Sequence, residues 1–177
     1  PSQPPPGVRF TISFPARRRA SPLQGRLLLM LSADSGAEPR FQISDGPATQ
    51  LIFGIDVANW EPGSEAVFTH TVFGFPLARL GDVPAGRYRV QALLNRYETF
   101  RLSTGHTVQL PPDRGEGQQW NQKPGNLYST PRAVLVDLVS DDAARVWPCP
   151  CPCPPSRHPP RAATAARPAA PTPRHHR

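Results

Sequence analysis

The sequence predicts an all-β protein, an antiparallel β-sandwich of immunoglobulin-like or transthyretin-like type with about seven or eight short strands. Three observations lead to this fold class. Short segments alternate apolar and polar residues with period two, Gly- and Pro-rich turns separate them, and no segment has the 3.6-residue period of an amphipathic helix. The 177 residues suffice for one domain, which we place at residues 8–140.

The first half of this domain supplies four predicted strands. Residues 8–14 (VRFTISF) alternate strictly, which indicates a strand with one buried face. The apolar GRLLLMLS at 25–32 is typical of a central strand. RFQIS at 40–44 and QLIFGIDV at 50–57 are expected to be two more strands, because the turn sequence DGP lies between them.

The second half supplies four more predicted strands. AVFTHTVF at 66–73 alternates again, and VPAGRYRVQALLN at 83–95 combines a Pro-Ala-Gly turn with four apolar or aromatic residues on one face. HTVQL at 106–110 follows a Ser-Thr-Gly turn, and RAVLVDLV at 132–139 closes the domain. The connection at 111–131 is longer than most loops of compact domains. Loops of that length are usually either functional or disordered.

This long connection contains GEGQQWNQKPGNLY, which sets large aromatics among side-chain amides. Linkers rarely contain large aromatics, because these are costly to leave in water unless they pack or bind. Two interpretations stay open: the loop covers one end of the sandwich or a domain seam, or it binds a carbohydrate or peptide. Trp60, in another loop, either packs at the core edge or joins the same surface. The candidate ligand or interface residues are Trp120, Tyr128, Gln118, Gln119, Asn121, Asn126 and Trp60.

The sequence contains no recognisable set of catalytic residues and no motif that predicts a metal or cofactor site. It lacks a Gly-x-Ser-x-Gly elbow, a phosphate-binding Gly-rich loop and a His-Glu-x-x-His helix. His70 is expected mid-strand as a packed, hydrogen-bonded residue, and His106 in an exposed turn. Asp113 and Glu116 are too few carboxylates for a good Ca²⁺ loop. We therefore expect no catalytic residue, no metal and no cofactor.

The charge argues against nucleic acid as a partner, although the net charge is +7. Five arginines and no acid lie in residues 148–177, and subtracting them leaves +2 for the rest of the chain. The basic cluster ARRRA at 16–20 reads as a solvated turn. No apolar run approaches the roughly 18 residues of a membrane span.

The last part of the chain differs in composition from the rest. Residues 141–177 are rich in Pro, Ala and Arg and cannot build a core, so we expect disorder there and at residues 1–7. The strict Cys-Pro alternation at 149–153 does not match the usual spacing of structural zinc ligands. Such a composition is also what a shifted reading frame in GC-rich DNA gives, so the tail is either a frameshift product or a natural Pro-rich extension.

Four segments carry a resemblance to a known family: EPRFQISDGPATQLIFGIDV, PAGRYRVQALLNRYETF, GHTVQLP and GEGQQWNQKPGNLYS. Together they resemble the N-terminal β-rich domain of secreted bacterial esterase-like proteins, over roughly Val8 to Asp137. In that family the domain precedes an enterochelin-esterase-like α/β-hydrolase domain. The serine, acid and histidine of such a hydrolase are absent from these residues.

The resemblance implies a periplasmic or secreted, non-catalytic accessory module. Such a module would pack against the adjacent α/β-hydrolase domain or present substrate to it. The alternative drawn from the residues themselves is a carbohydrate- or peptide-binding module that uses the 111–131 loop.

Overall fold

The fold of this chain is all-β, as the sequence predicts. The computed structural model describes residues 7–17, 19–46, 48–113, 115, 117 and 119–137, together with two short strand segments further on. No α-helix occurs in these ranges. The elements are β1 (Phe10–Ile12), β2 (Leu23–Ser32), η1 (Pro39–Phe41), β3 (Leu51–Trp60), β4 (Ala66–Phe68), β5 (Gly74–Phe75), η2 (Leu80–Asp82), β6 (Gly86–Arg96), β7 (Glu98–Arg101), β8 (Thr107–Leu110), β9 (Leu127–Tyr128), β10 (Arg132–Val136), β11 (Ala144–Val146) and β12 (Cys151–Pro152).

The main sheet has seven strands, in the order β12-β9-β6-β2-β3-β5, with β10 also paired to β6. Its pairs are antiparallel. The apolar strand β2 lies between β3 and β6, so that Leu29 stands opposite both Phe53 and Ala92. The prediction of a central strand at 25–32 is thus confirmed, because this strand is paired on both edges.

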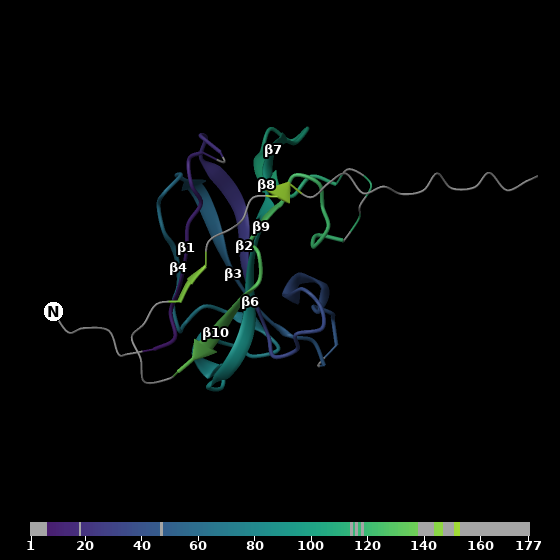
Figure 1. Cartoon of the computed structure of the whole chain (residues 1–177). Helices are drawn as coiled ribbons and strands as arrows, with labels where there is room; N and C mark the ends of the chain where they lie inside the picture. The colour runs from purple at the N-terminus through teal and green to yellow at the C-terminus, as the bar shows by residue number, and fades with distance from the viewer. Residues whose placement is uncertain are drawn as a thin grey trace, which may run out of the picture.

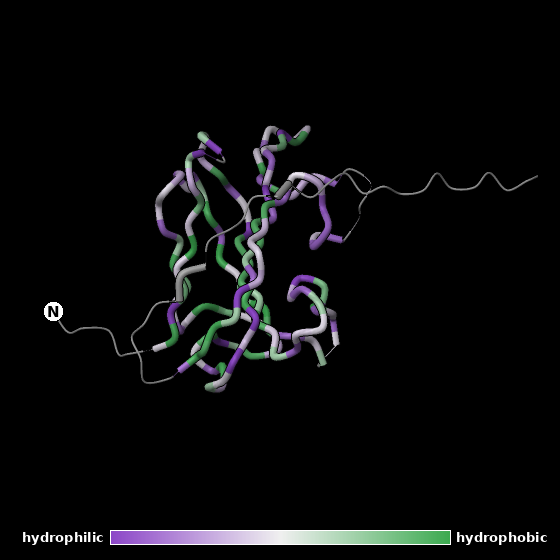
Figure 2. Tube along the Cα trace, in the orientation of Figure 1, coloured by the Kyte–Doolittle hydropathy of each residue, from purple (hydrophilic) through white to green (hydrophobic). Residues whose placement is uncertain are grey.

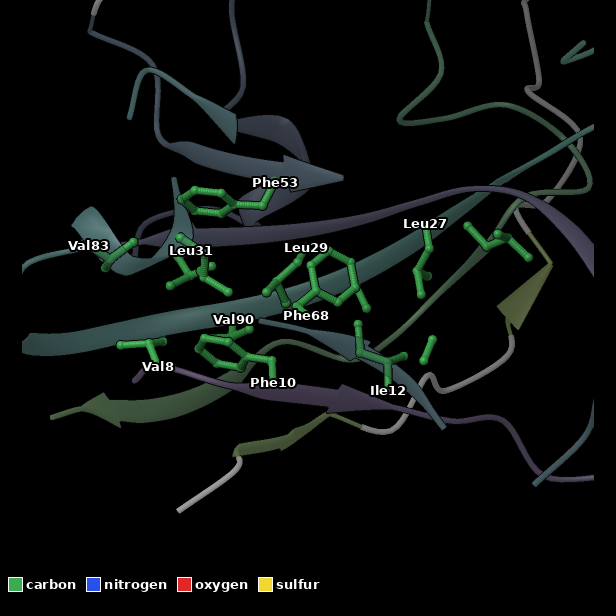
Figure 3. Packing of buried hydrophobic residues seen from close by; sticks show 14 of the residues in the cluster. Val8, Phe10, Ile12, Leu27, Leu29, Leu31, Phe53, Phe68, Val83 and Val90 are labelled. Carbon is green, nitrogen blue, oxygen red and sulfur yellow. The ribbon is translucent and has the colours of Figure 1, made fainter. Parts of the chain in front are cut away.

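A smaller sheet covers one face of the main sheet. It has the order β11-β1-β4, with β1 antiparallel to β4 and parallel to β11. Figure 3 shows Phe10, Ile12 and Phe68 of this layer facing Leu29 and Leu31 of β2. These side chains are almost fully buried, and in Figure 2 the hydrophobic residues lie mainly along the strands. The core therefore lies between the two layers.

The opposite face of the main sheet, here called the outer face, is also partly apolar. Register places Met30 of β2 beside Ile52 of β3 and Gln91 of β6, and Leu28 beside Leu93. Met30 and Leu93 are fully buried, so other segments of the chain cover this part of the outer face. Figure 1 shows the β2–β3 connection (blue) and the β8–β9 connection (green) on this side, away from β1 and β4.

Strands β7 and β8 form a separate two-stranded hairpin that projects from one end of the molecule (Figure 1). Their register pairs Phe100 with Val108 and Glu98 with Leu110. Because directly paired residues share a face, Phe100, Val108 and Leu110 lie on one side of the hairpin. Phe100 and Leu110 are exposed.

The predicted strand at 40–44 is wrong. The chain instead forms the 3-10 turn η1, which begins at Pro39 and has Arg40 buried. A proline at the first turn position suits a helical turn, since its missing N–H needs no partner there. The alternation of apolar Phe41 and Ile43 with polar residues therefore occurs in a turn and the loop after it, and it does not mark a strand there.

The predicted strand at 66–73 is correct only for Ala66–Phe68. The next residues turn, with the Val72 N–H donating to the Thr69 carbonyl, and His70 lies in that turn, half-buried. The expectation of a mid-strand His70 is therefore wrong, because the alternation continues through a turn. His106 is exposed in the β7–β8 turn, as expected, with Nδ1 3.0 Å from Thr104 Oγ1.

Several sequence expectations concern residues outside the described part of the chain. These include Gln118 and Glu116 of the long loop, residues 1–6 and most of 138–177. The disorder and the origin of the tail, and the exact domain limits, stay predictions.

Candidate functional site

Two long connections meet on the outer face of the main sheet. The first joins β2 to β3 and contains η1; the second joins β8 to β9 and contains Trp120. Figure 1 shows them on the same side of the sheet. The residues that hold these connections in place set the shape of the space between them.

Arg40 of η1 links the two connections directly. Its Nη1 donates to the backbone carbonyl of Asn121 at 2.8 Å, and Asn121 Nδ2 donates to the Arg40 carbonyl at 3.1 Å. The guanidinium carbon lies 4.2 Å from the ring centroid of Phe41 and 4.0 Å from that of Tyr128. Both distances are within the range of a cation–π contact. Tyr128 therefore packs beneath a cation, and Asn121 fixes the loop backbone.

Buried polar side chains tie this link to the sheet. Gln91 of β6 is 0% exposed; its Oε1 accepts from the Arg40 N–H, and its Nε2 donates to Glu38 Oε2 and to the Ser129 carbonyl. Ser129 Oγ accepts from the Ala92 N–H. Buried polar groups cost free energy unless they are paired, and here the two carboxamide atoms of Gln91 are. We call Glu38, Arg40, Gln91, Asn121 and Ser129 the clasp.

The Glu38 carboxylate forms an ion pair with the partly buried guanidinium of Arg40. Arg40 Nε donates to Glu38 Oε2 at 2.8 Å. Burial alone would raise the pKa of Glu38, but the hydrogen bonds from Gln91 and Arg40, with the positive charges of Arg40 and Arg89, together lower it. Glu38 is therefore held in its ionised form by the clasp.

Asn126 organises the end of the long loop. It is 1% exposed; Oδ1 accepts from the Arg96 N–H, and Nδ2 donates to the Trp120 carbonyl at 2.9 Å and to Asn95 Oδ1 at 3.2 Å. One side chain thus connects the backbone beside Trp120 to strand β6. Asn126 acts inside the loop and has no surface to offer a ligand.

A cleft of about 660 Å³ opens between the two connections. This volume is within the roughly 300–1,000 Å³ of small-molecule sites. Half-buried Trp120 lines it beside carboxylate, amide, hydroxyl and ammonium side chains. Its lining includes Ile43, Ser44, Asp45, Asn95, Gln119, Asn121 and Trp120.

Asp113 also lines the cleft, but its carboxylate accepts hydrogen bonds from its own loop. Asp113 Oδ1 accepts from the N–H groups of Gly115 and Gly117, at 2.8 and 3.3 Å. These backbone hydrogen bonds lower the pKa of Asp113. Both glycines have positive φ, 105° and 58°, a conformation that favours glycine. Asp113 therefore shapes the loop as a turn-forming residue.

The structure separates the residues that the sequence grouped together. Trp120, Gln119 and Asn121 line the cleft, whereas Asn126 is buried and Tyr128 packs against Arg40. Trp60 lies in the core: its ring is 4.8 Å from Phe14, edge to face, and Nε1 donates to the Ser64 carbonyl. Trp60 therefore does not join Trp120 at a common surface. Gln118 lies outside the described residues.

Sequence reasoning missed the wall that the residues after η1 supply. The alternating pattern places Ile43 in a predicted strand, Asp45 in the turn after it and Asn95 at the end of another predicted strand, and it gives no sign of the Arg40 link. The available signal was Pro39 directly before Arg40, since a proline suits the first position of a helical turn.

Among the described residues, no group of three or more His, Cys, Asp or Glu side chains lies together as metal ligands would. The same residues contain no helix long and apolar enough to cross a membrane. No family model, curated protein or solved structure was found to match the chain.

Proposed function

We propose that this chain is a non-catalytic binding module whose cleft beside Trp120 takes a carbohydrate. The observation that carries the proposal is the presence of a half-buried tryptophan in an open cleft of about 660 Å³, among side chains that can both donate and accept hydrogen bonds. A flat indole can pack against a sugar ring, and planar amides and carboxylates can bind its hydroxyl groups.

The construction of the cleft supports this proposal. Its walls are held by buried and partly buried hydrogen bonds: the clasp fixes one connection to the other, and Asn126 fixes the backbone at Trp120. A preorganised site loses less conformational entropy on binding than a loose loop does. A fixed cleft with exposed Asp45, Ser44 and Gln119 is suited to reading the arrangement of hydroxyl groups.

A carbohydrate is favoured over an extended peptide because of where the cleft lies. Peptides commonly add a strand to an exposed sheet edge and bind through backbone groups. The Trp120 cleft instead lies over the outer face of the sheet, where side chains line it. Binding there depends on side-chain hydrogen bonds and ring contacts, which suit a sugar.

Affinity electrophoresis against a panel of soluble polysaccharides tests the proposal. We expect one or more polysaccharides to retard the protein, and Trp120→Ala to abolish the retardation. Phe100→Ala is the matched control, since it removes an exposed aromatic of the β7–β8 hairpin that does not line the cleft. The proposal fails if no polysaccharide retards the protein, or if both variants lose retardation equally.

A second candidate function is packing against an α/β-hydrolase domain, as the family resemblance implies for a secreted or periplasmic protein. The specific observation in its favour is the β7–β8 hairpin, which exposes Phe100 and Leu110 on one face. A two-stranded hairpin is marginally stable by itself, and its apolar face gains by being covered. The two functions are compatible, because the hairpin and the cleft are different surfaces.

Co-purification with a hydrolase domain of that family tests the second candidate. We expect the wild-type module to bind, and Phe100→Ser with Leu110→Ser to weaken binding at least tenfold. Trp120→Ala should bind normally if the hairpin alone is the contact. Equal binding by the double variant would reject the hairpin as the interface.

A further inference from the structure

The Trp120 cleft continues into a second hollow of different chemistry. This second hollow, of about 480 Å³, shares Ile43, Ser44, Asp45, Asn95 and Trp120 with the first. Its other lining residues are Leu28, Ile52 and Phe75, all apolar. The larger hollow instead adds the polar Asp113, Gln119, Asn121 and Lys123, together with Pro111, Pro112 and Gly117. Trp120 and Ile43 thus stand between a polar compartment and an apolar one.

The apolar compartment is built by the register of three strands. Ile52 of β3 pairs with Phe75 of β5 and Met30 of β2, so their side chains form a row across the outer face. Leu28 stands in the next row, opposite Gly54, and its side chain lies over that glycine together with the Arg26 guanidinium, since a Cβ there would be 3.1 Å from Leu28 Cδ2 and 2.8 Å from Arg26 Nε. Phe75 is 44% exposed although it belongs to this floor.

Leu28 and Ile52 are half-buried, Phe75 is exposed, and all three adjoin the polar cleft, which indicates what sort of ligand would fill both spaces. Water covering Leu28, Ile52 and Phe75 is released when an apolar group replaces it, and this release favours binding in proportion to the apolar area that is buried. The polar compartment requires hydroxyl-like groups to pair with its amides and carboxylates. One ligand satisfies both only if it has a polar head and an apolar part.

We propose that the ligand is an amphiphilic glycoside, with its sugar ring in the polar compartment and an apolar substituent on the Leu28–Ile52–Phe75 floor. This inference rests on the carbohydrate function proposed above and specifies its ligand class. The argument for a glycoside rather than a covering protein domain is continuity: Trp120, Asn95 and Asp45 border both compartments, so a single small molecule can span them.

Calorimetric titration with matched glycosides tests this assignment. The probes are methyl and n-hexyl β-glycosides of glucose, galactose, mannose and xylose, used below their micelle concentrations, with 1-hexanol as the apolar control. For at least one sugar, we expect the hexyl glycoside to bind at least about tenfold more tightly than the methyl glycoside, since partial burial of five methylenes exceeds that gain. Hexanol alone should bind much more weakly.

Two variants test whether the higher affinity of the hexyl glycosides comes from contact with the Leu28–Ile52–Phe75 floor. Ile52→Thr introduces a hydroxyl at the apolar compartment while keeping a β-branched residue in the strand, and should remove most of the hexyl advantage without changing methyl glycoside affinity. Leu135→Thr is the matched control, since Leu135 is a strand leucine that is 65% exposed and lines neither compartment. It should leave the hexyl advantage intact.

The outcomes separate this inference from the proposed function. If methyl glycosides bind and hexyl glycosides bind no more tightly, the amphiphile assignment is overturned while carbohydrate binding stands. If no glycoside binds, or if hexanol binds as tightly as the hexyl glycosides, both proposals fail. A hexyl advantage that Ile52→Thr and Leu135→Thr reduce equally would show that the alkyl chain lies elsewhere, and would overturn the assignment.

Discussion

At the scale of single residues, the molecule depends on buried polar side chains that each serve two elements. Gln91 joins η1 to the chain after β9, and Arg40 joins η1 to the loop that carries Trp120. Such groups stabilise a structure only when every polar atom is paired, so a single loss leaves buried partners unsatisfied. The cleft walls are therefore expected to be sensitive to substitutions that never touch a ligand.

Glu38→Gln tests the charge in the clasp. The folded pKa of Glu38 lies below the ordinary value of 4.5, so its carboxylate contributes stability above the unfolded pKa, and this contribution is lost as pH falls through the folded pKa. We expect the variant to have a lower Tm than wild type at pH 7, and the difference to narrow below about pH 4.5. Thermal melts from pH 3 to 7 measure this. A pH-independent difference would contradict the assignment.

At the scale of elements, the short edge strand β5 packs closely against β3, although its two residues are too few to form an alternating strand pattern. A Cβ on Gly74 would collide with the Phe53 ring and the Ile52 carbonyl. Gly74 is therefore required for β5 to approach β3, and β5 in turn carries Phe75 to the floor of the apolar compartment.

Gly74→Ala should consequently destabilise the protein by about 1–3 kcal/mol, the usual cost of overpacking. Gly46→Ala is the matched control, because a Cβ there meets no atom within 4 Å. Urea denaturation of both variants measures the change in free energy of unfolding. Equal stability of the two variants would mean that β5 shifts away from β3 at little cost.

The element scale also shows where alternation of apolar and polar residues misleads. Residues 40–44 and 69–73 alternate as strands do, yet they form a 3-10 turn and a tight turn. In both places the alternation includes exposed aromatics, Phe41 at 45% and Phe73 at 71%, so the local period does not mark a buried face there and carries no information about backbone pairing.

At the scale of the whole molecule, one core joins two layers, and the outer face of the larger layer carries the cleft. Phe68 of β4 is fully buried against the main sheet. Phe68→Ala should reduce the free energy of unfolding by about 3–5 kcal/mol, the range for removing a buried aromatic.

Phe73→Ala is the control for that substitution, since Phe73 is 71% exposed. It should change stability by less than about 1 kcal/mol. Chemical denaturation of both variants gives the comparison. A small effect at Phe68 would mean that the smaller sheet contributes little to the stability of the main one.

The sequence by itself determined the fold class, the central position of β2 and the strands at 50–57 and 83–95. Each of these follows from interactions between near neighbours in the chain: period two places one face in the core, and a continuous apolar run requires cover on both faces. It also identified Trp120, Gln119 and Asn121 as candidate site residues, because aromatics among amides are costly in a free loop.

Only the tertiary structure decided which candidates share a surface. Trp60 entered the core, Asn126 became an internal hydrogen-bonding residue, and Tyr128 came to lie against Arg40, 88 positions away in the chain. The opposing wall and the apolar floor come from β2, β3, β5 and the β2–β3 connection. Sheet register and loop packing bring these distant segments together, and neither is encoded in the local pattern of any one of them.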